Sequence, residues 1–319
     1  MQLSKVDFID QYWGALADHG WISLILHDWQ RIPHNVVSDI DYVVSGPEPK
    51  ELIRVLHEYC QASGWQLVQI LEHEVNSLCC ICFQQEAPLE SVSFDVTWDY
   101  RRKGIDLISN SVLIEGAWQP MGKAFHVPAP RVEFLYRLIK AAAKSKDLMN
   151  QEDLVDALFE IHQEDPEGVD LLLKEHSSEM IGVQKDRRSF LKKVNEVLTG
   201  KYFSAVESGR AYGAKEIARR FRRVVQPTGM LVGYQGEISE EIRQEVFSIH
   251  SETFRKFEVN EGAGRWANDW MARRKSFLML RKALAKGGED LLVKETSTEG
   301  IASQILLYLA ERLRGRWSL

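Results

Sequence analysis

The sequence contains few cysteines and no long apolar run, and both shortages limit what the chain can be. Its four cysteines are Cys60, Cys79, Cys80 and Cys82, and no second pair of cysteines or histidines follows at a spacing typical of zinc sites. We therefore expect buried free thiols in a reducing cytoplasm. No hydrophobic stretch approaches the ~20 residues of a membrane span. The acidic start of the chain also differs from a signal peptide.

A nucleic-acid-binding motif is also missing, although the chain has basic runs. The 319 residues carry a formal net charge of −6. The charge is unevenly distributed: residues 1–130 are net negative and residues 201–319 are net positive. The basic runs at 219–223, 273–275 and 314–316 are interpreted as solvated helix faces, because no known nucleic-acid-binding pattern accompanies them. We therefore do not expect a nucleic-acid partner.

What the first part of the chain does contain is a mixture of helix and strand patterns. Apolar residues at helical spacing predict helices over 4–19 and 46–64. Short apolar runs predict strands over 21–26, 40–45, 65–73, 77–84 and 91–99. This order predicts an α+β domain over 1–128, with a small mixed β-sheet that carries helices on one face.

Two further regions follow after the prolines at 127–130. Residues 129–200 are predicted to form a helical domain, with helices over 131–145, 150–163, 165–176 and 186–200. Residues 201–319 are predicted to form a smaller C-terminal α/β region. It contains strands over 228–236 and 289–295 and helices over 209–224, 239–258, 263–286 and 299–314.

Three aspartates occupy strand positions where apolar residues are expected. Asp39 and Asp41 alternate in "SDIDYVVS", so their side chains project to the same face of the strand, and Asp95 lies in "SVSFDVTWD". Neighbouring carboxylates repel one another unless a cation compensates them. Oxygen ligands suit Mg²⁺ or Mn²⁺, so the three acids predict a metal site. The alternative is that the two strand acids have neither a metal-binding nor a catalytic role.

The residues "SDIDYVV", followed by a helix, two strands and "SFDVTW", resemble the nucleotidyltransferase superfamily, which includes polymerase beta and antibiotic nucleotidyltransferases. The resemblance covers roughly 1–145. It implies a metal-dependent enzyme that moves a nucleoside monophosphate from an NTP to a hydroxyl of a small molecule, sugar or protein. It also implies that Asp39 and Asp41 hold metal ions. Asp95 would hold the catalytic metal and help activate the acceptor hydroxyl.

The sequence departs from this family before Asp39. The family has a Gly-Ser turn that contacts the triphosphate, whereas this chain has "LHDWQ" with His27 and Asp28, and we expect Arg31 to compensate the added acid. The pattern LxxWxxxPxxxxSDID resembles a subgroup found with bacterial surface-polysaccharide genes. The predicted nucleotide-binding residues are Ser38, Arg31, Lys140 and Lys144, and secondary candidates for phosphate contacts are Arg101, Arg102 and His126.

The C-terminal region carries a second resemblance. The stretch "RRFRRVVQPTGMLVGYQGE" resembles the start of a thymidylate-kinase-like domain, but it lacks the Lys and Ser/Thr of a phosphate-binding loop. A degenerate kinase-like remnant is therefore expected. Trp266, Trp270 and Phe277 are predicted to lie on one helix as a packing face, with a homodimer interface as the alternative.

Two other functions compete with nucleotidyl transfer. The chain could be a catalytically inactive member of the fold that serves as a binding or regulatory module. It could also be a sugar-nucleotide-dependent glycosyl or phosphoryl transferase that uses the same acid cluster.

Overall fold

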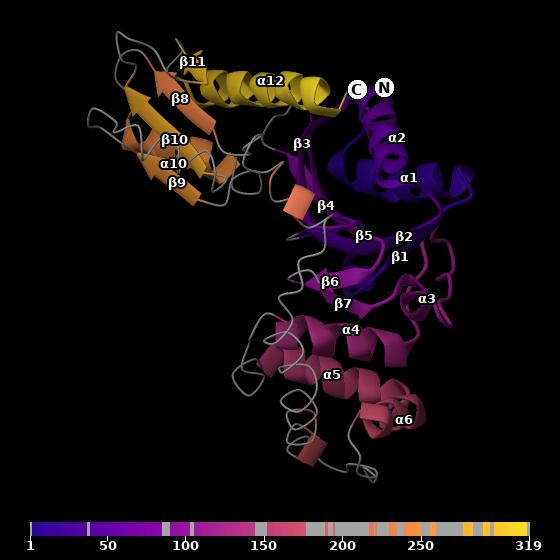
Figure 1. Ribbon diagram of the computed structural model, residues 1–319. Coiled ribbons are helices and arrows are strands. Elements are labelled where there is room, and N and C mark those ends of the chain that lie inside the picture. The colour runs from indigo at the N-terminus through magenta and orange to yellow at the C-terminus, as the bar shows by residue number, and fades with distance from the viewer. Residues whose placement is uncertain are drawn as a thin grey trace.

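The structure is a computed structural model (Figure 1). It describes residues 2–36, 39–84, 90–102, 105–143, 152–176, 189–190, 194, 217–219, 221, 230–234, 239–249, 256–259, 277–282, 290–293 and 297–317.

A five-stranded mixed sheet forms the centre of the N-terminal region. Two of its strands are parallel neighbours, β2 and β5, and the other neighbouring pairs are antiparallel. The order across the sheet is β1-β2-β5-β4-β3. Every strand overlaps its predicted range, which confirms the mixed α+β class. The strands are β1 (Ile22–Ile25), β2 (Ile40–Ser45), β3 (Trp65–Glu74), β4 (Ser77–Gln84) and β5 (Ser91–Thr97).

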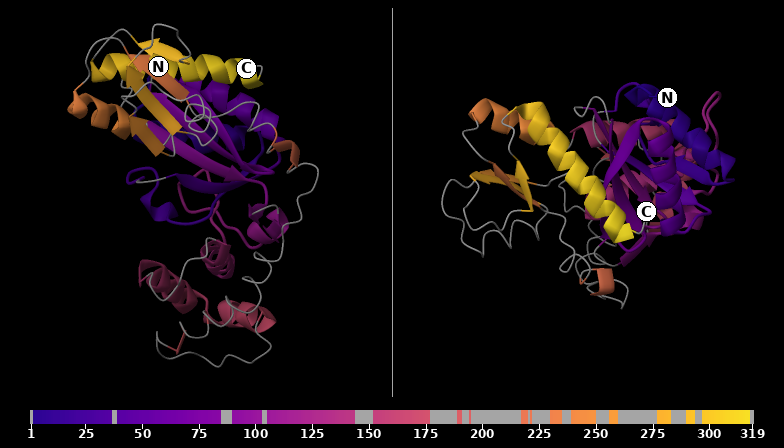
Figure 2. Two further views of the ribbon diagram at one scale, coloured as in Figure 1. Left: turned by 60° about the vertical axis from the view of Figure 1, so that its left-hand side comes forward. Right: turned by 90° about the horizontal axis from the view of Figure 1, so that it is seen from above.

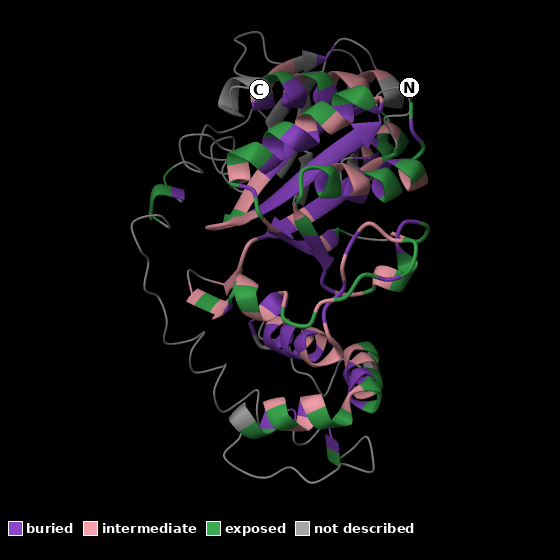
Figure 3. Ribbon diagram, turned by 90° about the vertical axis from the view of Figure 1, so that its right-hand side faces the viewer, coloured by how far each residue is buried: buried purple, intermediate pink, exposed green. Residues whose placement is uncertain are grey.

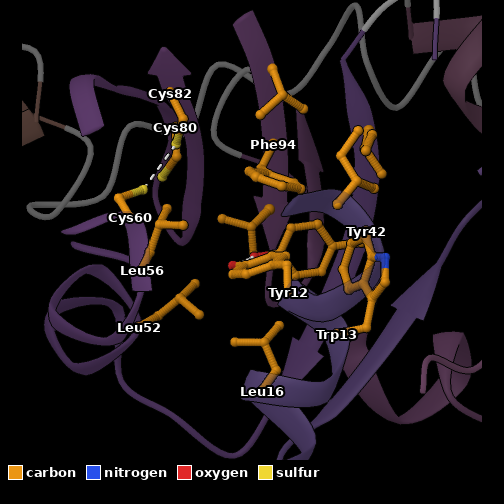
Figure 4. Close-up of a cluster of buried hydrophobic side chains, with 14 of the residues drawn as sticks. Tyr12, Trp13, Leu16, Tyr42, Leu52, Leu56, Cys60, Cys80, Cys82 and Phe94 are labelled. Carbon is orange, nitrogen blue, oxygen red and sulfur yellow. Dashed lines mark hydrogen bonds between the residues drawn. The ribbon is translucent and has the colours of Figure 1, made fainter. Parts of the chain in front are cut away.

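Helices α1 (Lys5–Asp18) and α2 (Pro49–Ala62) cover one face of this sheet. The aromatic side chains of α1 fill the space beneath it, and the ring of Phe8 stacks on Trp65 with 4.2 Å between centroids. The hydroxyl groups of Tyr12 and Tyr42 are 2.8 Å apart and form a hydrogen bond inside this core (Figure 4). This hydrogen bond satisfies both buried hydroxyl groups.

The two helices of the predicted 1–128 domain share one face, as expected, and the opposite face is covered by helices from later in the chain, which was not predicted. Helix α4 (Pro130–Ala143) packs on β1 and β2, where Ile139 joins Leu24 and Val43. Helix α12 (Thr298–Trp317) packs on β3 and β4, where Ile305 joins a cluster with Val68 (Figure 2). The strands therefore bury side chains on both sides (Figure 3), which agrees with their nearly continuous apolar runs.

Short elements that the sequence does not predict lie between β1 and β2 and between β5 and α4. A 3₁₀ helix η1 (Trp29–Arg31) follows β1. The strands β6 (Tyr100–Arg102) and β7 (Ile105–Ile108) pair antiparallel, and the short helix α3 (Asn110–Leu113) comes after them.

The helical region contains α4, α5 (Glu152–Glu164) and α6 (Pro166–His176), which match the predicted ranges to within two residues at each end. Their apolar faces meet around Phe134, Leu158 and Leu173, which are buried. The backbone N–H of Gly168 donates to Asp165 Oδ1 at 2.9 Å, and this bond caps the start of α6. Most of the predicted helix 186–200 lies outside the described residues.

The C-terminal region contains a parallel four-stranded sheet in the order β11-β8-β10-β9. The predicted helix over 263–286 is wrong, because β10 occupies part of it, and the predicted helix 239–258 ends early, because β9 follows α10. A short apolar run such as "FLMLRK" does not distinguish a buried strand from a helix by periodicity. The elements are β8 (Met230–Tyr234), α10 (Glu240–Ile249), β9 (Lys256–Val259), β10 (Phe277–Lys282) and β11 (Leu291–Val293).

This correction also removes the predicted helical aromatic face. Phe277 begins strand β10, while Trp266 and Trp270 lie outside the described residues. The four cysteines are free and buried, as predicted. None of the helices in the described part of the chain combines the length and apolar character that a membrane crossing requires.

Candidate metal and nucleotide site

Three aspartates come together on the sheet face that α4 covers. Strand β2 turns Ile40 and Tyr42 toward the core under α1 and α2, so Asp41 projects to the opposite face. The parallel register pairs Asp41 directly with Asp95 of β5. Asp39 immediately precedes β2 and projects to the same side. The local alternation of apolar and acidic residues therefore produces the cluster.

The cluster has the ligand set of a divalent metal site. One carboxylate oxygen from each of Asp39, Asp41 and Asp95 lies within 4.8 Å of the other two. An ion bound at about 2.0–2.6 Å from each oxygen can span such separations. Asp39 is exposed, and the other two residues are only partly accessible, so solvent reaches the cluster from the side of Asp39. Carboxylate oxygens are hard ligands, so the chemistry of the cluster suits a hard cation.

Asp41 also has two basic neighbours. Lys140 of α4 donates from Nζ to Asp41 Oδ2 at 2.6 Å. His27 Nε2 lies 2.8 Å from the same oxygen and 3.2 Å from Lys140 Nζ. Both basic groups pack against the buried ring of Tyr136, His27 stacking on it and Lys140 lying over it at 5.3 Å from the centroid. The segment after β1 and the distant helix α4 therefore converge on one carboxylate.

Asp28 is compensated by groups other than the predicted Arg31. Its Oδ2 lies 2.8 Å from His27 Nδ1, and its Oδ1 accepts a hydrogen bond from Arg137 Nη2 at 3.2 Å. Arg137 also donates from Nε and Nη2 to Glu133 Oε1, at 2.8 and 2.7 Å. Asp28 has φ 55 and ψ 25, a left-handed conformation that aspartate tolerates better than most residues. The ion pairs thus form one chain from Glu133 to Asp41.

The pKa shifts of these groups follow from their contacts. Burial by itself would raise the pKa of Asp41, but the hydrogen bond with His27 and the charge of Lys140 outweigh it and hold this pKa below its usual range. Burial opposes protonation of His27, yet its hydrogen bonds to Asp28 and Asp41 raise the pKa of the ring. A protonated ring can donate to both carboxylates, so His27 serves as a second cation between them.

The other predicted site residues that the structure describes form no hydrogen bond or ion pair with Asp41. Arg31 lines a small hollow that also contains Asp39 and Asp41. Arg101 forms an ion pair with Asp106 across the β6–β7 pair, so its guanidinium group is already engaged by an acid. The predicted nucleotide contacts Ser38 and Lys144 lie outside the described residues.

Sequence reasoning did not anticipate the roles of Arg137 and Glu133. A signal was present on α4, where Glu133, Arg137 and Lys140 are spaced by four and three residues and therefore share one helix face. In the sequence, His27 and Asp28 stand out only as a departure from a family pattern. The structure pairs His27 with Asp41 of the cluster and with Asp28, and it pairs Asp28 with Arg137 of α4.

Comparison with known proteins adds no relative: no protein-family model matches the chain, and neither a curated protein nor a solved structure matches it significantly.

Proposed function

We propose that the chain is a metal-dependent nucleotidyltransferase that moves a nucleoside monophosphate from an NTP to a hydroxyl group of a small molecule, sugar or protein. The supporting observation is the juxtaposition of Asp41 and Asp95 on adjacent parallel strands with Asp39, which immediately precedes β2. In the reaction, the acceptor hydroxyl oxygen bonds to the α-phosphorus and the hydroxyl loses its proton. The bond from that phosphorus to pyrophosphate breaks, and pyrophosphate leaves.

The residues of the chain divide the work as follows. Asp39, Asp41 and Asp95 would hold Mg²⁺ or Mn²⁺, which when bound would neutralise negative charge on the phosphates. A carboxylate oxygen of Asp95 takes the proton of the acceptor hydroxyl. Lys140 donates one hydrogen bond to Asp41 and has two further N–H groups that can donate to phosphate oxygens. Arg31 adds positive charge at the neighbouring hollow.

A second function is favoured by one specific observation. Lys140 and His27 already neutralise Asp41, so a resident ammonium group and a resident imidazole stand where a metal ion is expected. Such an arrangement suits a catalytically inactive member of the fold that acts as a binding or regulatory module. The two functions differ in whether the acids bind a metal together with a nucleotide.

The first experiment measures binding. The midpoint of thermal unfolding is followed with Mn²⁺ and with ATP, CTP, GTP or UTP, each added separately, because a bound ligand raises the midpoint. We expect at least one metal–nucleotide pair to stabilise the wild type. Asp41→Asn and Asp95→Asn should lose this response, whereas Asp18→Asn, an exposed acid of α1, should retain it. A wild type that no pair stabilises contradicts the enzyme proposal.

The second experiment identifies the product. Sugar hydroxyls are the first acceptors to test, because of the resemblance to the polysaccharide-associated subgroup. Nucleotidyl transfer releases pyrophosphate, whereas glycosyl transfer from a sugar nucleotide releases a nucleoside diphosphate. Binding of a nucleotide without pyrophosphate release from any acceptor supports the binding module. We expect the reaction in a reducing cytoplasm, since all four cysteines are free.

A further inference from the structure

A cavity of about 900 Å³ lies beside η1, α4 and α5. Its volume falls within the range of small-molecule binding sites. It shares His27, Asp28 and Arg31 with the small hollow beside Asp39 and Asp41. The three aspartates of the metal site are not among the described residues that line it. The cavity is therefore a neighbour of the metal site and has its own lining.

Arg137 and Lys140, two of the basic groups that line the cavity, are already compensated by acids. Arg137 is held by Asp28 and Glu133, and Lys140 is held by Asp41. An anionic ligand would have to compete with these carboxylates. Arg31 also lines this end, and among the described residues it is the one cation of the cavity without an ion pair.

The wall formed by α5 has the opposite character. Exposed carboxylates recur along it at spacings of three and four residues, which places them on one side of the helix. Its other side is buried through Val155 and Leu158. Within the described residues, Asp153, Glu160 and Glu164 have no ion-pair partner. The acids that line the cavity from this helix are Asp153, Asp156, Glu160 and Glu164.

Two tryptophans complete the lining. The rings of Trp29 and Trp118 meet edge to face, with 5.8 Å between centroids and an interplanar angle of 86°. Trp118 is 47% exposed, which is unusual for so large an apolar ring. The face of a tryptophan ring attracts an ammonium group, as do carboxylates. The aromatic and acidic walls therefore favour the same kind of ligand.

We propose that this cavity is a binding site for a small amine-bearing cation. Its ammonium group contacts the carboxylates of α5, and its carbon skeleton packs against Trp29 and Trp118. The proposal goes beyond the proposed function, because it requires neither a nucleotide nor a metal ion.

The test measures binding to the full chain by isothermal titration calorimetry. The probes are spermidine and glucosamine, with glucose as the neutral counterpart of glucosamine. We expect both amines to bind with one-to-one stoichiometry and glucose not to bind. The combined variant Asp153→Asn/Glu160→Gln/Glu164→Gln should bind the amines at least tenfold more weakly. Glu167→Gln removes an exposed acid of α6 outside the cavity and should leave binding unchanged.

A second measurement separates this proposal from the proposed function. Asp95→Asn should retain amine binding even where it loses the response to metal and nucleotide. Addition of spermidine should change the tryptophan fluorescence of the wild type, and Trp118→Phe should reduce that change. Failure of both amines to bind, or equal binding by the triple variant and Glu167→Gln, overturns the proposal.

Discussion

At the scale of single residues, the carboxylate of Asp41 decides how the site behaves before any ligand arrives. It is largely buried, and burial of a lone carboxylate costs several kcal/mol. Lys140 and His27 offset this cost by contacting the same oxygen. Removal of either cation should therefore be felt in the stability of the whole chain.

We predict that Lys140→Met lowers the free energy of unfolding by about 2 kcal/mol, because Asp41 keeps its charge but loses its shortest hydrogen bond. Added Mn²⁺ should make this decrease in the free energy of unfolding smaller, since a bound ion replaces the missing positive charge. Urea denaturation with and without Mn²⁺ measures both effects. Lys174→Met, an exposed lysine of α6, should change stability by no more than about 0.5 kcal/mol. Equal stability of Lys140→Met and the wild type would contradict the prediction.

A second residue-scale prediction concerns pH. The hydrogen bond with His27 lowers the pKa of Asp28 in the folded chain. The stabilisation from ionised Asp28 is therefore complete above its unfolded pKa of about 3.9, and it is lost as the pH falls through the lower folded pKa. Asp28→Asn, which tolerates the same left-handed backbone, should cost about 1 kcal/mol at neutral pH because the side chain is half exposed.

The measurement for Asp28 is denaturant unfolding of both proteins at several pH values. Asp28 also raises the pKa of His27, so the difference between the two proteins should decrease as the pH rises above the unfolded histidine value of about 6.5. It should stay constant from about pH 6 to 5 and shrink below about pH 4. A difference that grows as the pH falls below about 4 would contradict the assigned ion pairs.

At the scale of elements, the connection between β2 and α2 depends on a glycine. Gly46 has φ +128, and a Cβ added there would lie 2.7 Å from Trp21 Cδ1. At Gly14, inside helix α1, an added Cβ would meet no atom within 4 Å. These two glycines therefore give a matched pair for one substitution.

We predict that Gly46→Ala destabilises the chain by about 1–3 kcal/mol, because it combines an unfavourable backbone conformation with a steric clash. Gly14→Ala should instead stabilise it by about 0.5–1 kcal/mol, since alanine is the better helix former. Midpoints of thermal unfolding followed by circular dichroism compare the two. A neutral Gly46→Ala would show that this connection can rearrange without cost.

At the scale of the whole molecule, α12 joins regions that are far apart in sequence. Its residues share one apolar cluster with β3, β4 and the C-terminal sheet (Figure 2). Ile305 is fully buried in this cluster, whereas Leu307, two positions later, is 58% exposed. The last helix therefore completes the core of the second sheet face.

We predict that Ile305→Ala lowers the free energy of unfolding by about 2–5 kcal/mol, as expected when a buried aliphatic side chain leaves a cavity. Leu307→Ala should stay within about 0.5 kcal/mol of the wild type. Guanidinium denaturation followed by tryptophan fluorescence measures both. Similar values for the two variants would mean that α12 does not pack on the sheet as described.

The predictability of the fold varied with the pattern in each segment. The strand with Asp41 and the helix α4 were predictable because alternation and helical spacing are local properties. Strand β10 was mistaken for helix, because its six residues carry no polar face that could reveal the period. The three acids were predictable as a cluster only on the assumption that β2 and β5 are neighbours, and their parallel register confirms this.

The sequence by itself determined which side chains face the core and which acids share a strand face, because the two-residue period of a strand and the 3.6-residue period of a helix are set locally. Only the tertiary structure decided which groups compensate those acids. Lys140 lies 99 positions from Asp41 and Arg137 lies 109 from Asp28. Chain-distant groups meet only when α4 packs on the sheet, and no local pattern encodes that packing.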